Sequence, residues 1–188
     1  AFTYDWVSWI VSLGAWRCWV RTSLKHIGAE PGARVLELAH GTGNLQLDLN
    51  ERGYCAIGYD LSPAMGRIAR KKLSRTNFPV RLARGQAQRL PFASDSFTAV
   101  ISTFPTDFIT APETLREVYR VLKPDGVLVI VPNALLTGSG LIERALEWVY
   151  QITGQRERGS RGASDDDMAT WFVPFHASMM EERCPRSV

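Results

Sequence analysis

Apolar residues recur through the first 27 positions of the chain at alternating spacings of four and three. They are Phe2, Trp6, Trp9, Leu13, Trp16 and Val20. This spacing places them along one face of a helix. Because Gly14 interrupts the pattern, we predict two helices, one on each side of it.

Short apolar runs alternate with amphipathic segments between residues 33 and 133. The runs at 97–103 and 126–131 are rich in β-branched residues, as expected of strands buried on both faces. Strands that alternate with helices predict βαβ units, and therefore an α/β fold with a doubly wound, mostly parallel sheet and helices on both faces. The expected strands are 34–39, 55–59, 80–83, 97–103 and 126–131, and the expected helices are 44–52, 63–75 and 112–122.

The remaining residues, 134–188, give a weaker pattern. An amphipathic helix is expected at 141–152, followed by a mobile loop in the Gly-, Arg- and Ser-rich segment 154–164. The length of 188 residues suits one domain with a sizeable core. We therefore predict a single domain with N-terminal helices at 1–28, a core at 33–133 and a C-terminal part at 134–188.

The composition is that of an ordinary globular protein, with 45% apolar and 22% charged residues. No apolar run reaches the roughly 18 residues of a membrane span, and no secretory signal opens the chain. The three cysteines cannot all pair within the chain, and no Cys/His spacing typical of a metal site connects them. We expect a cytoplasmic protein without a bound metal.

The net charge of +3 is too small an excess to indicate nucleic-acid binding, so no nucleic-acid partner is expected. The basic residues are nevertheless unevenly spread. Eight of them crowd one stretch, namely Arg67, Arg70, Lys71, Lys72, Arg75, Arg81, Arg84 and Arg89. Two interpretations stay open, a patch that favours an anionic surface and a solvated helix face.

The segment from Glu37 to Gly43 lies where the first expected strand meets a helix. Small residues there let a ligand approach the backbone, and the helix start offers free N–H donors. An acid such as Glu37 would repel a pyrophosphate but suits a cationic ligand group. A dinucleotide fingerprint would also need a third glycine, where this chain has Gln46. The alternative is that the glycines serve only a tight turn.

Asp60 ends the second expected strand, 19 residues after Gly41. An acid at this place can accept the two hydroxyls of a ribose. Its alternative role is helix capping, but Ser62 before Pro63 suits that role better. The segment 85–92 after the third strand carries polar residues that can bond an adenine edge. Together the three strand ends describe a nucleoside pocket.

The run from Val35 to Pro132 resembles the class I S-adenosylmethionine-dependent methyltransferases. The motifs 37–43, Asp60, 85–92 and 120–126 match that family. The resemblance implies a Rossmann-like fold, an N-terminal helical lid at 1–28, S-adenosyl-L-methionine as cofactor, S-adenosyl-L-homocysteine as product and a small-molecule acceptor. The implied cofactor-binding residues are Tyr4, Glu37, Ala39, His40, Gly41, Thr42, Gly43, Asp60, Leu61, Met65, Gln86, Ala87, Gln88 and Thr103.

Within that class the chain looks most like the ubiquinone/menaquinone C-methyltransferase type and relatives that act on small lipophilic molecules or phospholipid head groups. Four features depart from the pattern. His40 replaces the usual Gly or Cys, and Gln86 stands where an acid often recognises the adenine amino group. The segment 102–108 lacks the Asn/Asp-Pro-Pro-aromatic motif of base-methylating enzymes and the loop sequence of the quinone enzymes. The antiparallel strands that finish the family's sheet are also missing after residue 167, so we expect an incomplete C-terminal part rather than an early end of the sheet.

Methyl transfer from a sulfonium mainly requires that donor and acceptor be held in line. A carbon or hydroxyl acceptor benefits from a base, for which Asp107 is the first candidate, before Tyr4, His40 and His176. Three interpretations of the tryptophans in the N-terminal helices stay open: they pack in the core, they line an acceptor pocket, or they touch a membrane surface transiently. An NAD-dependent oxidoreductase and a catalytically silent binding module are the rival functions. The acceptor atom and the oligomeric state are not determined by the sequence.

Overall fold

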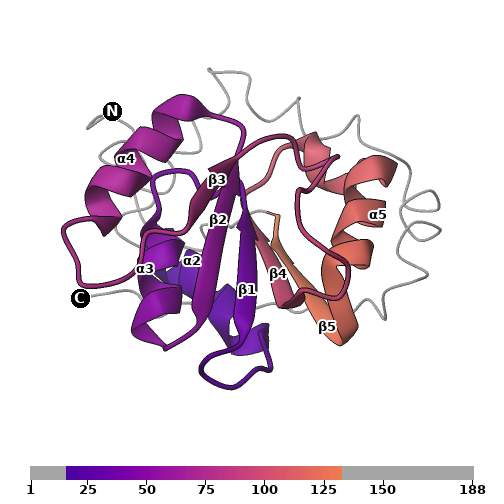
Figure 1. Cartoon of the computed structure of the whole chain (residues 1–188), viewed down its shortest axis with the longest axis horizontal. Coiled ribbons are helices and arrows are strands. Elements are labelled where there is room, and N and C mark those ends of the chain that lie inside the picture. The colour runs from indigo at the N-terminus through magenta and orange to yellow at the C-terminus, as the bar shows by residue number, and fades with distance from the viewer. Residues whose placement is uncertain (1–15, 133–188) are drawn as a thin grey trace, which may run out of the picture.

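The computed structural model describes residues 16–132, which form an open parallel sheet with helices on both faces (Figure 1). The strand order is β3-β2-β1-β4-β5, with every neighbouring pair parallel. This is the expected doubly wound α/β fold. The strands are β1 (Arg34–Leu38), β2 (Cys55–Asp60), β3 (Leu82–Arg84), β4 (Phe97–Thr103) and β5 (Leu122–Val131).

The helices divide between the two faces because alternate strand residues point to opposite sides of the sheet. Val35 of β1 packs with Leu45 and Leu49 of the helix that follows, whereas Leu36 packs with Val118 on the other face. The helical segments are α2 (Trp16–Thr22), η1 (Ser23–His26), α3 (Asn44–Glu51), α4 (Pro63–Leu73), η2 (Asp107–Thr110) and α5 (Pro112–Val121). Each face of the sheet therefore has its own apolar core.

The helix starts follow the expected local chemistry. Ser62 caps α4, its Oγ accepting a hydrogen bond from the Met65 N–H at 3.3 Å, and Pro63 occupies the first turn. Pro112 likewise occupies the first turn of α5, although its N-cap residue Ala111 makes no side-chain hydrogen bond. α4 follows β2 after a short turn, whereas η2 lies between β4 and α5. Both junctions lie at the carboxyl edge of the sheet because each follows the C-terminal end of its strand.

Two strands begin at least two residues away from their predicted starts. β3 has only three residues and begins at Leu82, two positions later than expected. β5 begins at Leu122, because Leu122 already pairs with Phe97, while Ala99 pairs with Val127. The intervening Lys-Pro-Asp-Gly segment forms an irregularity in the strand, with Asp125 at a φ of +63°. The predicted strand starts only at residue 126, at the end of this segment.

An ion-pair cluster joins the N-terminal helix α2 to α3. Asp48, 3% exposed, accepts hydrogen bonds on Oδ1 from Arg17 Nη2 at 3.1 Å and from Arg21 Nε at 3.0 Å and Nη2 at 2.6 Å. Together with Val20 and Leu24, these contacts fix α2 against the face that carries α3. The residues expected to form the rest of the lid and the C-terminal part lie outside the described range. Within the range, no helix has the length and apolarity that a bilayer crossing requires.

Candidate functional site

The loop between β1 and α3 turns sharply at the carboxyl edge of the sheet. Ala39, Gly41 and Gly43 have φ values of +57°, +52° and +80°, and the Gly43 N–H donates to the His40 carbonyl at 2.9 Å. A side chain at position 43 would meet Ala69 of α4, since its Cβ would lie 2.9 Å from the Ala69 Cβ. A Cβ at Gly41 would come no closer than 4.0 Å to any of its surroundings. Gly43 thus serves helix packing, and the Gly41 backbone faces open space.

Asp60 connects this loop to the end of β2. Its Oδ2 accepts the Gly41 N–H at 2.9 Å, and its Oδ1 accepts the Ser62 N–H at 2.7 Å. The N-cap of α4 is Ser62 and not Asp60, as expected. Each carboxylate oxygen has two lone pairs, so both oxygens keep the capacity to accept one more hydrogen bond. Asp60 is therefore a loop anchor with room for ligand hydroxyls.

Glu37 lies beneath the loop and not at its surface. The side chain is 2% exposed and accepts a hydrogen bond from Gln46 Nε2 of α3 at 2.7 Å. Burial raises the pKa of Glu37 to about 8, because water no longer solvates the charged form; the Gln46 hydrogen bond opposes this, and nearby Asp60 adds to it. The carboxyl is thus mostly protonated at neutral pH. Strand alternation sends the Glu37 side chain toward α3, and its contact with a cationic ligand group stays a prediction.

His40 points back over β2 toward α4. Its ring lies against Gly58, where a Cβ would approach the His40 Cδ2 to 2.9 Å. Nδ1 lies 3.0 Å from the Gly41 carbonyl oxygen, which requires the proton on Nδ1 and leaves Nε2 as the acceptor of a neutral ring. Burial lowers the pKa of His40, and Asp60 partly opposes this. A neutral imidazole therefore lies beside the Asp60 carboxylate.

A cleft of about 240 Å³ opens beside these two residues, between α4 and β3. Its lining residues are His40, Asp60, Ser62, Pro63, Gly66, Arg67, Arg70, Leu82, Ala83 and Arg84. The predicted adenine-side residues Gln86, Ala87 and Gln88 are not among them. The cleft brings together His40 and Asp60, which were predicted as site residues, with three arginines that were not.

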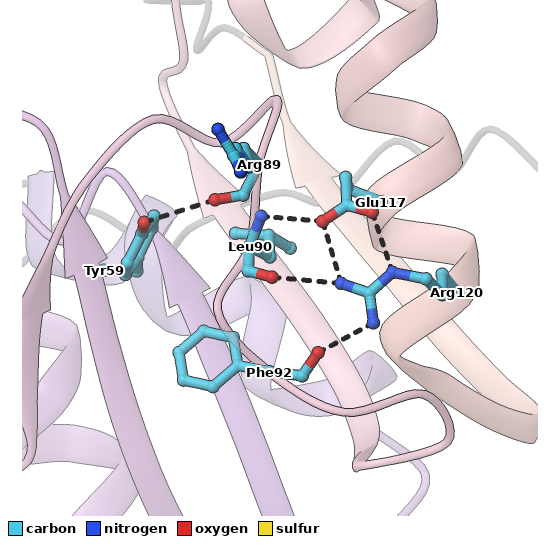
Figure 2. Close-up of polar contacts among 6 residues, drawn as sticks. All are labelled: Tyr59, Arg89, Leu90, Phe92, Glu117 and Arg120. Carbon is cyan, nitrogen blue, oxygen red and sulfur yellow. Dashed lines mark hydrogen bonds and ion pairs between the residues drawn. The ribbon is translucent and has the colours of Figure 1, made fainter.

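The loop that follows β3 is held from the opposite face of the sheet (Figure 2). Arg120 of α5 donates from Nη1 to the Phe92 carbonyl at 2.7 Å and from Nη2 to the Leu90 carbonyl at 3.0 Å. Glu117 accepts the Leu90 N–H at 2.7 Å. Arg120 Nε also donates to Glu117 Oε1 at 2.7 Å, and this pairing lowers the pKa of Glu117. We call Glu117 and Arg120 the α5 clasp.

Tyr59 supports the same loop from β2. Its hydroxyl lies 3.5 Å from the Arg89 carbonyl oxygen, at the limit of hydrogen bonding (Figure 2). Its ring packs edge to face on the Phe92 ring, with 5.7 Å between the ring centroids. Gly85 has to be small, because a Cβ there would overlap the Tyr59 hydroxyl. The Gln86–Gln88 segment is thus held at its start by Gly85 and at its end by the α5 clasp.

The other predicted residues are scattered along the carboxyl edge. Thr42 is buried, Met65, Ala87 and Thr103 are half-buried, and Gln86 and Gln88 are exposed. Leu61 is 59% exposed, an unusual position for a large apolar side chain. Asp107 is exposed at the start of η2, directly after β4. Tyr4, His176, Trp6 and Trp9 lie outside the described residues. Among residues 16–132, no three His, Cys, Asp or Glu side chains are grouped so that they could hold a metal ion.

Sequence reasoning missed Gln46 and the α5 clasp as supporting residues. Gln46 was read only as a missing glycine, yet it is 1% exposed and bonded to Glu37. Its signal was the pairing of a polar residue with an acid across a strand–helix junction. For the clasp, the signal was the i, i+3 spacing of Glu117 and Arg120 on an otherwise amphipathic helix.

The fold is that of a Rossmann-like α/β domain, and the glycine loop and Asp60 lie at the point where the strand order reverses. The family described as Methyltransferase domain matches residues 35–126. The demethylmenaquinone methyltransferase of Thermus thermophilus is 37% identical over 166 residues, which cover 85% of this chain and 76% of that protein. The demethylmenaquinone methyltransferase of Beutenbergia cavernae is 40% identical over 128 residues, 68% of this chain and 52% of that protein.

The solved structures agree with this result. The crystal structure of the YcgJ protein from Bacillus subtilis matches with a TM-score of 0.64 at 25% identity, covering 83% of this chain and 66% of that one. The chain belongs to the family of class I S-adenosylmethionine-dependent methyltransferases. It spans about half the length of several curated relatives that it matches.

Replacing Glu37 with Gln should change how stability depends on pH. In the unfolded chain Glu37 ionises near its ordinary pKa of 4.5, whereas in the folded chain it stays protonated up to about pH 8. The folded state therefore binds one more proton between these values, and the wild-type free energy of unfolding falls as pH rises through this window. Glu37→Gln should remove that fall. Near pH 8 the variant's free energy of unfolding should therefore have risen by about a few kcal/mol relative to that of the wild type.

Urea denaturation at several pH values across this window measures the effect. Glu30→Gln, a change at an exposed acid, is the matched control and should keep the wild-type slope. Parallel curves for wild type and Glu37→Gln would mean that the Glu37 carboxyl ionises normally in the folded chain.

Replacing Arg120 with Lys should loosen the loop after β3. An ammonium cannot reproduce the planar fork that reaches both carbonyls and Glu117, so we expect a loss of about 1–2 kcal/mol in the free energy of unfolding. The amide of Leu90 should also exchange with solvent faster. Arg116→Lys, an exposed position one turn earlier on α5, is the control. Equal losses in the two variants would contradict a specific role for the α5 clasp.

Proposed function

We propose that this chain transfers a methyl group from S-adenosyl-L-methionine to a small lipophilic acceptor of the quinone type. The observation that carries the proposal is the Asp60 carboxylate, which ends β2 within hydrogen-bonding distance of the Gly41 N–H of the glycine loop. This arrangement offers acceptors for ribose hydroxyls directly beside an open stretch of backbone. Family membership supports the same cofactor.

The residues at the edge fit an adenosyl cofactor. The free lone pairs of Asp60 suit two ribose hydroxyls, and the space in front of Gly41 suits a closely approaching ligand. Leu61, Met65 and Ala87 supply apolar surface for an adenine ring, and the amides of Gln86 and Gln88 can bond its edge. Ala39, His40, Thr42, Gly43 and Thr103 complete the proposed binding set, together with Tyr4. The bound cofactor would supply a methyl group on a sulfonium, which leaves as a neutral thioether.

The loop can take a cationic ligand group although the acid beneath it, Glu37, carries no permanent negative charge. Because Glu37 is mostly protonated at neutral pH, it does not place an uncompensated charge beneath the loop. A positive group above the loop would favour ionisation of Glu37, since opposite charges lower the pKa of an acid. Glu37 then supports the glycine loop from beneath, and its ionisation would increase when a cationic ligand group binds.

Asp107 is the proposed base for the acceptor. It follows β4, on the other side of β1 from Asp60 in the strand order, where Thr103 is the one proposed cofactor residue of the described range. Its carboxylate can take a proton from a hydroxyl or an activated carbon. The acceptor class rests on the relatives, which are named demethylmenaquinone methyltransferases. A phospholipid head group is the alternative acceptor.

The division of the chain belongs to the same proposal. Residues 1–28 act as a lid, 33–133 bind the cofactor, and 134–188 contribute to the acceptor side. The expected cytoplasmic location is kept and would be tested by cell fractionation. An NAD-dependent oxidoreductase is disfavoured because Gln46, in place of the third glycine, is committed to Glu37.

Calorimetric titration should show binding of S-adenosyl-L-homocysteine and much weaker binding of NAD. Asp60→Ala should weaken the S-adenosyl-L-homocysteine complex by about 1.5–3 kcal/mol, the usual contribution of hydrogen bonds to a charged group. Glu51→Ala, a change at an exposed acid, is the control and should bind as the wild type does. If neither S-adenosyl-L-homocysteine nor NAD binds, the result would favour a silent module. Tighter binding of NAD than of S-adenosyl-L-homocysteine would favour the oxidoreductase.

Methyl transfer to a short-chain demethylmenaquinone, followed with labelled S-adenosyl-L-methionine, should depend on Asp107. Asp107→Asn removes the base but keeps the shape, so kcat should fall by about 100-fold or more while S-adenosyl-L-homocysteine binding stays unchanged. Glu113→Gln, at the start of α5, is the nearby control. An unchanged kcat in Asp107→Asn would remove Asp107 from the reaction.

A further inference from the structure

The positive charge of the chain is concentrated in one segment. Residues 61–90 contain eight of the 22 basic residues and none of the 19 acidic ones. The rest of the chain holds 14 basic and 19 acidic residues and is therefore net negative. Seven of the eight are exposed, while Lys72 is half-buried and donates to Asn44 Oδ1 at 2.7 Å. The proposed function gives no role to these eight basic residues.

The fold gathers these charges at one side of the molecule, on α4 and beside the edge strand β3 (Figure 1). Arg67 and Arg70 of α4 line the same cleft as Arg84 of β3. Lys71 lies one helical turn after Arg67, and Arg75 follows in the turn after α4. We call these five residues the basic face.

Nothing within the described part of the chain neutralises the basic face. The ion pairs of residues 16–132 involve Arg17, Arg21 and Arg120, and none involves a residue of the basic face. Asp60 lines the neighbouring cleft, but none of these ion pairs joins it to the basic face, and one carboxylate cannot offset five cations. Uncompensated like charges repel one another, and an external anionic surface would relieve this repulsion.

We propose that the basic face docks on an anionic membrane surface. Exposed Arg and Lys on the outer side of a helix can reach lipid phosphates together, and their aliphatic stems tolerate the interfacial region. A nucleic acid fits less well, because Phe78 is the single aromatic residue between positions 61 and 90 and is half-buried, so no exposed ring is available for base stacking. Docking would bring the cleft with His40 and Asp60 next to the lipid surface.

This inference does not depend on methyl transfer, so it is tested without cofactor or acceptor. The full chain is mixed with vesicles of phosphatidylcholine alone and with vesicles in which one lipid in three is phosphatidylglycerol, and flotation measures binding. Binding should require phosphatidylglycerol and should weaken strongly as salt is raised, because salt screens exposed charges. A single-stranded RNA and a DNA duplex are titrated in parallel.

The key variant replaces Arg67, Arg70, Lys71 and Arg75 with Gln. Each cation near an anionic bilayer strengthens binding by about five-fold, so the fourfold variant should bind at least about 100-fold more weakly. The matched control replaces Lys25, Arg52, Arg116 and Lys123, which are exposed elsewhere, with Gln and removes the same charge. Both variants keep side chains suited to helices, and their melting temperatures are measured to establish folding.

Lipid binding that the fourfold variant loses and the control keeps supports the proposal. Equal losses in the two variants would overturn it, since net charge alone would then explain the binding. Binding to phosphatidylcholine alone, no binding to either vesicle, or tighter binding to RNA or DNA than to the anionic vesicles would also overturn it.

Discussion

The contact between Asp60 and the Gly41 N–H is the constraint on which the rest of the site depends. β1 and β2 run side by side in parallel, so their carboxyl ends meet at one edge, and the loop after β1 has to cross the end of β2. Ala39 and Gly41 adopt left-handed φ values there, a conformation that needs outside support when the residue is not glycine. Asp60 supplies that support, and its second oxygen fixes the turn into α4 through Ser62. One carboxylate therefore sets the position of two backbone segments that border the site.

Beneath the loop, Glu37 and Gln46 solve a second problem, which is how to place an acid in a core. An ionised carboxylate buried without a cationic partner would be unfavourable by several kcal/mol. A protonated carboxyl paired with an amide avoids this, and the pairing contributes about 1 kcal/mol as an ordinary hydrogen bond. The missing third glycine and the buried acid are thus one feature. A glycine at position 46 would leave Glu37 without its partner.

The sequence predicted most of the elements because the hydrophobic alternation of buried parallel strands is local. It also separated the roles of Asp60 and Ser62 correctly, since an N-cap before Pro63 is a local signal. It did not predict that the Glu37 side chain points toward α3. Residues two apart in a strand point to the same face of the sheet, so the position of Glu37 relative to Val35 already indicated this direction. The i, i+3 spacing indicates the pairing of Glu117 with Arg120 but not their contacts with the loop after β3, because Arg120 meets Leu90 and Phe92 across 30 and 28 positions of sequence. The early start of β5 depends likewise on pairing with β4.

The two faces of the sheet support different parts of the same edge. On one face, α3 and α4 pack beneath the glycine loop through Gln46 and Ala69. On the other face, α5 holds the loop after β3 through two carbonyls and one amide. Because β3 and β5 are the outer strands of the described sheet, the basic face flanks the half formed by β3, β2 and β1, while Asp107 follows β4 on the other half. A ligand bound across the edge would therefore have its nucleoside end beside the positive side of the molecule and its reacting end away from it. The charge asymmetry of the chain thus sets an orientation of the site relative to any anionic surface, independent of the chemistry that the site performs.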